Sequence, residues 1–160
     1  MKNNNTFYSN LSKLLPTVLL LLGGILAHSV TVFGQEKSAT LIIEVVGMRN
    51  NTGKIIGSVF NSKSGFPGTP NLAKYLVEQE ITNNSSRIKI ENVPFGNYGV
   101  SLVHDENSNQ RLDTNFIGIP KEGIGMSNNA EGSFGPPSFE EASFEFSKKA
   151  QTIQIRIKYY

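Results

Sequence analysis

The sequence predicts an all-β fold, a seven-stranded antiparallel β-sandwich with one long ordered loop. Segments rich in β-branched residues alternate with turn signals from residue 39 onward, and no amphipathic helical pattern of three turns follows the first 34 residues. Strands at hairpin spacing are typical of two packed antiparallel sheets. We therefore expect one sandwich domain over residues 35–160, with transthyretin-like or immunoglobulin-like strand order, because periodicity does not encode pairing.

The first 34 residues have the pattern of a signal peptide. A start containing Lys2 and Lys13 precedes an apolar run over residues 14–27, after which the chain becomes polar. A membrane-spanning helix needs about 20 apolar residues, so this shorter run favours a cleaved leader. We expect cleavage after Gly34, with a second small-residue site at Ser29. The protein would then be exported, to the periplasm, the cell surface or the medium, with no stable membrane insertion after cleavage.

Composition excludes several classes of protein. The chain has no cysteine, which rules out disulfides, thiolate zinc sites, a cysteine nucleophile and a lipoprotein-type acyl anchor. It has 15 basic and 13 acidic residues, and removal of the leader with its two lysines leaves 13 of each. A net charge of zero gives no electrostatic case for nucleic acid or for an anionic membrane surface.

The first half of the domain predicts two hairpins. Residues 39–48 and 54–60 are both β-branched and are separated by an Asn-Asn-Thr-Gly turn. Residues 74–81 also fit helical spacing, but we favour a strand. After an Asn-Asn-Ser-Ser turn, apolar and charged residues alternate over residues 88–91, which predicts the partner strand of the second hairpin.

The second half predicts three more strands. A Pro-Phe-Gly-Asn turn leads into residues 98–104, whose alternate members share one face: Tyr98, Val100, Leu102 and His104. Residues 142–147 and 151–159 alternate clearly as well. Between them, residues 105–140 have no strand signal, and such long loops are usually functional or disordered. We expect this loop to be ordered by apolar anchors at Leu112, Phe116, Ile117, Ile119, Ile124, Met126, Phe134 and Phe139.

One stretch has the spacing of a calcium-binding loop. Oxygen-bearing side chains occupy its positions 1, 3, 5 and 9, and a backbone carbonyl would serve at position 7. The predicted metal ligands are Asp105, Asn107, Asn109, Arg111 through its carbonyl, and Asp113. A hard cation needs six to eight oxygens, which a tight loop with inward alternate side chains can supply.

The calcium pattern has two departures. Gln110 stands where Gly eases the turn, and Phe116 stands where a bidentate Glu normally completes the shell. Glu106 and Glu122 are the nearest replacements for that carboxylate. The alternative is a loop in which Asn and Asp side chains bond their own backbone and need no metal.

Most of the domain resembles a known family. The residues that carry the resemblance are HDEN and LDTN within 104–115, GIPKEG over 118–123, SNN over 127–129 and FGPPSF over 134–139. They are similar to the exported bacterial proteins of the domain of unknown function 2141 family, which implies fold and compartment but no activity. Residues 93–103 also look like a strand start in transthyretin-like and collagen-adhesin B-type sandwiches. Some of the latter hold calcium in Asp- and Asn-rich loops, so this resemblance adds to the metal hypothesis.

Three hypotheses for function follow. We favour a non-enzymatic exported module, possessing no catalytic residues, whose long loop binds an unknown protein or small ligand. The second is a hydrolase-type enzyme using His104 with Asp105 or Glu122, although no Gly-x-Ser-x-Gly elbow is present. The third is a surface-assembly component whose edge strands pair with neighbouring molecules.

Overall fold

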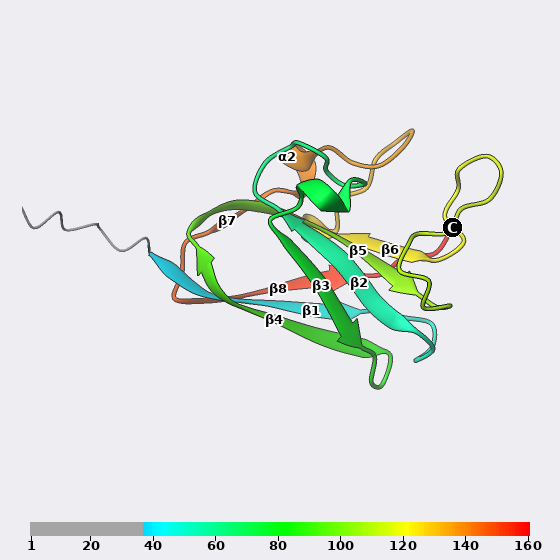
Figure 1. Ribbon diagram of the computed structural model, residues 1–160, viewed down its shortest axis with the longest axis horizontal. Coiled ribbons are helices and arrows are strands. Elements are labelled where there is room, and N and C mark those ends of the chain that lie inside the picture. Colours follow the sequence, from blue (N-terminus) through cyan, green and yellow to red (C-terminus); the bar gives the residue numbers. More distant parts are fainter. Residues whose placement is uncertain (1–36) are drawn as a thin grey trace, which may run out of the picture. The chain divides into compact units, whose positions relative to one another are not determined.

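The computed structural model describes residues 37–160, which form eight strands in two sheets (Figure 1). One sheet has the order β4-β1-β8, and its members are β1 (Ser38–Val46), β4 (Ser85–Pro94) and β8 (Ala150–Arg156). The second has the order β3-β2-β5-β6, with β7 also pairing with β5; it consists of β2 (Lys54–Phe60), β3 (Tyr75–Glu80), β5 (Gly96–Asp105), β6 (Gly123–Met126) and β7 (Phe144–Phe146). The predicted leader and its cleavage site lie outside the described residues.

The all-β prediction is confirmed, with two differences in detail. The described residues form eight strands where seven were expected, and β1 pairs with β8 in parallel rather than antiparallel. Their helices are short: a single turn α2 (Phe139–Ala142) and 3-10 turns at Pro70–Leu72 and Ser127–Asn129. β8 runs parallel to β1 because a long stretch of chain connects them, whereas a hairpin would reverse the direction of the second strand.

The core lies between the inward faces of the two sheets. Leu41, Ile43 and Val45 of β1 are fully buried, because alternate residues of a strand point to the same side. Across the core, β5 contributes the predicted series Tyr98, Val100, Leu102 and His104. His104 is therefore a polar residue at a core position, where the sheet meets the long loop.

Neither predicted hairpin forms. β1 and β2 belong to different sheets, and residues 47–53 carry the chain across the sandwich. β3 and β4 also belong to different sheets, and the links between them include a bridge between Thr82 and Ser85 and a hydrogen bond from Ser86 Oγ to the carbonyl oxygen of Glu80 at 2.9 Å. A turn motif specifies a reversal of the chain, but not whether the next strand pairs edge to edge or packs face to face. Strands with one apolar face can do either, so these two predictions were wrong.

The crossing at residues 47–53 depends on a glycine. Gly53 has a φ of +72°, and a Cβ there would lie 1.9 Å from the carbonyl oxygen of Asp105. The absence of a side chain therefore lets this turn lie directly against the end of β5. That contact places the turn beside the start of the long loop.

Residues 105–140, predicted as a loop, contain the short strand β6, which the sequence did not indicate. β6 pairs with β5, with Gly123 opposite His104 and Met126 opposite Ser101. Its Gly-Ile-Gly-Met sequence has a single β-branched residue, Ile124, between two glycines, which are rare in strands. The glycines are needed because the chain after β8 crosses here: a Cβ at Gly123 would lie 2.4 Å from Ile157 Cγ2 and 2.6 Å from Tyr159 Cε1.

The apolar anchors expected in this loop are only partly correct. Met126 is buried, and Phe139 packs edge-on against Phe66 at 5.7 Å between ring centroids. In contrast, Phe116 and Phe134 are fully exposed, and the remaining exposed members are Leu112, Ile117 and Ile119. The loop is ordered mainly by hydrogen bonds, which an apolar pattern does not reveal.

Candidate functional site at the base of the long loop

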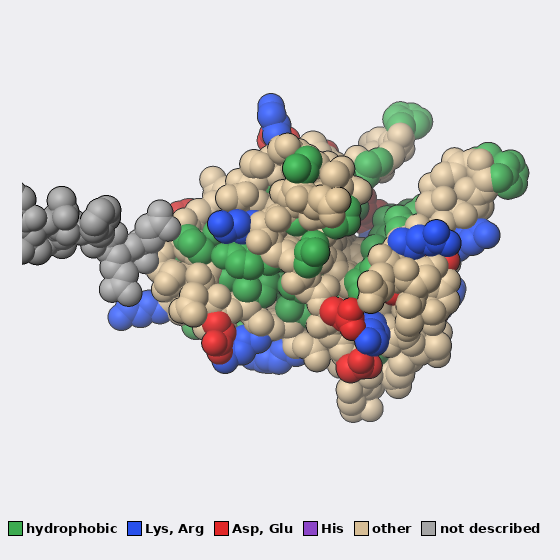
Figure 2. All heavy atoms as spheres, in the orientation of Figure 1, with side chains coloured by type: hydrophobic (Ala, Val, Ile, Leu, Met, Phe, Trp, Pro, Cys, Tyr) green, Lys and Arg blue, Asp and Glu red, His purple; other side chains and the backbone are tan. Residues whose placement is uncertain are grey.

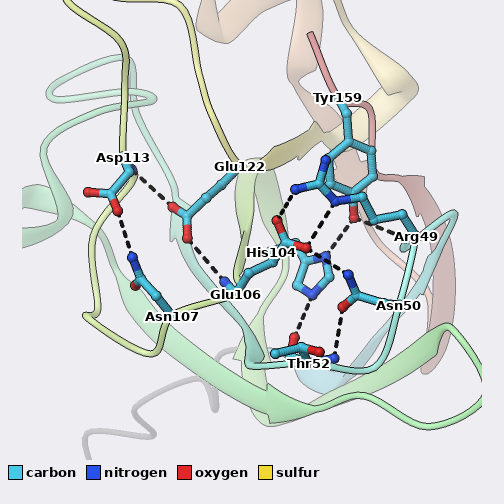
Figure 3. A network of polar contacts seen from close by, with 9 residues as sticks. All are labelled: Arg49, Asn50, Thr52, His104, Glu106, Asn107, Asp113, Glu122 and Tyr159. Carbon is cyan, nitrogen blue, oxygen red and sulfur yellow. Dashed lines mark hydrogen bonds and ion pairs between the residues drawn. The ribbon is translucent and has the colours of Figure 1, made fainter.

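A polar network joins the β1–β2 turn, the end of β5, the long loop and the C-terminal segment (Figure 3). We call it the loop-base network; its members are Arg49, Asn50, Thr52, His104, Glu106, Glu122 and Tyr159. At its centre, His104 is 0% exposed and both ring nitrogens are occupied. Nε2 lies 2.7 Å from the carbonyl oxygen of Thr52, and Nδ1 lies 2.5 Å from the Tyr159 hydroxyl. A carbonyl only accepts, so Nε2 carries a proton and, in the neutral ring, Nδ1 accepts from Tyr159.

Tyr159 connects the histidine to the β1–β2 turn. Its hydroxyl accepts a hydrogen bond from the backbone N–H of Arg49 at 3.1 Å, while the Arg49 guanidinium lies 4.6 Å from the ring centroid. Burial raises the pKa of the Tyr159 hydroxyl above its usual value. The side chain reaches this place because Gly123 leaves the space beneath its ring.

Glu106 connects the same turn to the start of the long loop. Arg49 donates to both of its carboxylate oxygens, at 2.9 Å and 2.5 Å, and Asn50 Nδ2 donates at 2.8 Å. The bond from Arg49 is the main reason that the pKa of Glu106 is held below its usual value. The Glu106 side chain is only 18% exposed and that of Arg49 is 53% exposed, so the carboxylate is shielded from solvent better than the guanidinium is.

Glu122 holds together two points of the long loop. It is 4% exposed, and its two oxygens accept the backbone N–H groups of Glu106 and Asp113, each at 3.0 Å. These two amides lie at opposite ends of a loop segment, and one carboxylate holds both. A buried carboxylate needs such donors, because an unpaired charge in the interior is very costly.

The predicted calcium ligands are brought together in one loop. Asp105 is 1% exposed and accepts the backbone N–H groups of Asn109 and Gln110 at 3.1 Å and 2.8 Å. Asp113 Oδ2 accepts from the side-chain amides of Asn107 at 2.7 Å and Asn109 at 3.0 Å. These amides lower the pKa of the Asp113 carboxyl.

The same loop also contains the Asx turns of the metal-free alternative. Asn107 Oδ1 accepts from the N–H of Asn109, and Asn109 Oδ1 accepts from the N–H of Arg111, at 3.1 Å and 3.0 Å. Arg111 directs its charged side chain to solvent, 3.5 Å from Asp113. Within residues 37–160, no group of three His, Asp or Glu side chains is arranged to hold a metal ion. The calcium site stays a prediction.

The residues proposed for catalysis are used by the fold. His104, Asp105 and Glu122 are all buried, and each is hydrogen-bonded to the chain itself. A general acid or base must reach the proton that it transfers, and these groups face protein. In this geometry the three side chains hold the adjoining turn and loop in place through hydrogen bonds.

Sequence reasoning missed Arg49, Asn50 and Tyr159. The signal for Tyr159 was present, since it continues the alternation of Ile155 and Ile157, which are buried, just as His104 continues that of β5. Two polar side chains at the ends of two inward-facing series are candidates to bond each other. Arg49 and Asn50 had no such signal in the sequence, because their contacts depend on how residues 47–53 cross between the sheets.

Residues 43–154, well over half of the chain, match a family model described as an uncharacterized protein conserved in bacteria, DUF2141. The chain belongs to this family. The DUF2141 match runs from β1 into β8, so it includes the loop-base network apart from Tyr159. No curated protein and no solved structure matches the chain significantly, and the resemblance to transthyretin-like sandwiches is not confirmed. Among the described residues, no helix is long and apolar enough to cross a membrane.

Proposed function

We propose that this DUF2141 protein is an exported, non-enzymatic binding module whose contact surface is the loop between β5 and β6. The observation that carries the proposal is an ordered loop with an apolar side chain directed fully into solvent. Phe116 is 98% exposed, although the loop that holds it is fixed by Glu122 at its base. Exposed apolar residues on a rigid scaffold are typical of interaction sites. Export rests on the apolar run at residues 14–27.

Site-specific cross-linking tests the contact surface. A photoreactive phenylalanine analogue replaces Phe116 in one variant and Leu76 in a matched control, and both are expressed in the bacterium that produces the protein. Leu76 is 66% exposed and lies on the edge strand β3. We expect adducts from position 116 and none from position 76. Adducts from position 76 alone would favour edge-strand assembly, and equal labelling at both positions would overturn the proposal.

We further propose that calcium stabilises this loop. What supports it is the gathering of Asn107, Asn109 and Asp113, whose side chains lie within hydrogen-bonding distance of one another. Rotating the two amides would turn their carbonyl oxygens towards Asp113 and would break the two Asx-turn hydrogen bonds that these oxygens now accept. Such oxygens, with Asp105 and the carbonyl of Arg111, are ligands suited to calcium.

Thermal unfolding tests the calcium proposal. An ion that binds only the folded state raises Tm, and a chelator reverses the gain. We expect this in the wild type and in the control Glu140→Gln, a substitution on the exposed side of α2, but not in Asp113→Asn. An unchanged Tm at millimolar calcium would contradict the calcium proposal and would leave the proposal of the contact surface standing.

A further inference from the structure

Two loops of the domain end in exposed phenylalanines. Phe116 lies at the tip of residues 113–121, which we call the 113–121 hairpin, and Phe134 lies in residues 130–137, the 130–137 loop. They are 98% and 106% exposed, and Ile117 beside Phe116 is 64% exposed. Figure 2 shows apolar side chains at the ends of two loops that project towards the same side of the molecule, coloured yellow-green and orange in Figure 1. In this view both tips stand out from the body of the domain.

The 113–121 hairpin holds its tip rigidly away from the domain. Its backbone is paired by Lys121 N–H to Asp113 O at 2.9 Å and Asn115 N–H to Ile119 O at 2.8 Å. The side chain of Asn115 also accepts from the N–H groups of Ile117 and Ile119, at 3.0 Å and 2.9 Å. These bonds fix the backbone that carries Phe116, so its exposure is built into the loop.

Two basic side chains lie near the base of this hairpin. Residues 107–121 contain two basic residues, Arg111 and Lys121, and one acidic residue, Asp113. Asp113 accepts from Asn107 and Asn109 and also lies 3.5 Å from Arg111, whose side chain is 76% exposed. Lys121 is exposed as well. Figure 2 shows Lys and Arg atoms at the base of the projecting loop. The net charge of the whole chain does not reveal this arrangement, in which an apolar tip stands above a base with a local formal charge of +1.

We propose that the 113–121 hairpin and the 130–137 loop dock reversibly on a phospholipid bilayer that contains anionic lipids. The apolar tips enter the boundary between headgroups and acyl chains, while Arg111 and Lys121 contact lipid phosphates. A protein partner would need a separate pocket for each projecting phenylalanine, whereas a fluid bilayer accommodates both without one. This proposal rests on the proposed function and names the partner of the same loop. It requires no membrane-spanning segment.

Co-sedimentation with lipid vesicles tests the docking. The protein is purified as it accumulates in the producing cell and mixed with phosphatidylcholine vesicles with or without phosphatidylglycerol. Phe116→Ser with Phe134→Ser should weaken partitioning at least about tenfold. The matched control, Leu72→Ser with Leu76→Ser, removes two exposed leucines elsewhere and should bind as the wild type does. Arg111→Gln with Lys121→Gln should weaken binding about tenfold or more on the anionic vesicles alone.

Three results would overturn the docking. They are a wild type that stays in the supernatant, a phenylalanine double variant that sediments as well as the wild type, and self-association that the same double variant abolishes. Circular dichroism of each variant establishes that it is folded. If vesicle binding fails while position 116 cross-links to a protein, the lipid proposal is wrong and the binding module stands. If position 116 forms no adduct with protein or lipid, both fail.

Discussion

His104 illustrates how a polar residue is tolerated at a core position. It occupies the fourth inward site of β5, after Tyr98, Val100 and Leu102, and both its nitrogens have partners. Among the described residues, no buried side-chain nitrogen or oxygen lacks a hydrogen bond. An unsatisfied buried group costs about 1–3 kcal/mol, so the fold can bury a histidine at position 104 only because both its nitrogens have partners.

Removing the Tyr159 hydroxyl should therefore destabilise the domain. We expect Tyr159→Phe to lower the free energy of unfolding by about 1–3 kcal/mol, because His104 Nδ1 loses its buried partner. Urea denaturation measures this. The control Tyr160→Phe changes a 68% exposed ring and should stay within about 0.5 kcal/mol of the wild type. Equal midpoints for the two variants would show that Tyr159 contributes packing alone.

Gly123 should be intolerant of even a methyl group. A Cβ there would approach Ile157 and Tyr159 within 2.6 Å, so Gly123→Ala must displace the tyrosine from His104. We expect a loss of about 1–3 kcal/mol and a change in the NMR signals of the His104 ring. Gly68→Ala is the matched control, because a Cβ at Gly68 meets nothing within 4 Å. A variant with unchanged ring signals would contradict the placement of Tyr159.

At the scale of single elements, α2 is a one-turn helix that depends on its capping box. Ser138 Oγ accepts from the N–H of Glu141 at 3.3 Å, and Glu141 Oε2 accepts from the Ser138 N–H at 2.7 Å. The bond from this backbone N–H is the main cause of the lowered pKa of the Glu141 carboxyl. α2 follows the 130–137 loop, so its cap helps fix where that loop ends.

Acid should loosen α2 through Glu141. Because the folded-state pKa is lowered, the stabilisation is complete above the ordinary glutamate pKa and is lost as pH falls through the folded value. An NMR titration should therefore move the Ser138 amide signal in this window. Glu141→Gln keeps a capping acceptor without a charge, so its Ser138 signal should lose this dependence. A wild-type signal that is flat across the acid range would contradict the cap.

At the scale of the whole molecule, β8 completes one of the two sheets. It supplies Ile155 to the core and is followed by Ile157, both buried. A chain that stops after residue 149 should show no cooperative thermal unfolding, because it loses this sheet edge and the partner of His104. The matched control stops after residue 159 and should unfold as the full chain does. A sigmoidal transition in the shorter chain would contradict this dependence.

The sequence predicted the strands better than their partners. Alternation located β4, β5, β7 and β8, because burial on one face of a strand makes every second residue apolar. β-Branched composition located β1 and β2, and β3 was favoured over a helix. These patterns could not distinguish a hairpin from a crossing between sheets, and they overlooked β6, whose glycines accommodate residues from a distant strand. The sequence also identified the polar loop that contains Asp105, Asn107, Asn109 and Asp113, whose role as a metal site stays a prediction. Arg49 and Asn50 had no comparable signal in the sequence, because their contacts depend on the tertiary arrangement.

The parallel pairing of the first and last strands also constrains how this protein is made. Leu41 lies opposite Gln151, 110 positions later, so that ladder closes a long stretch of chain. During synthesis β1 has only β4 as a neighbour until residues 150–156 emerge from the ribosome. Contacts of such separation slow folding, and a late-folding chain stays unstructured longer. For the export that we propose, this delay would be an advantage, because a translocation pore admits an unfolded chain.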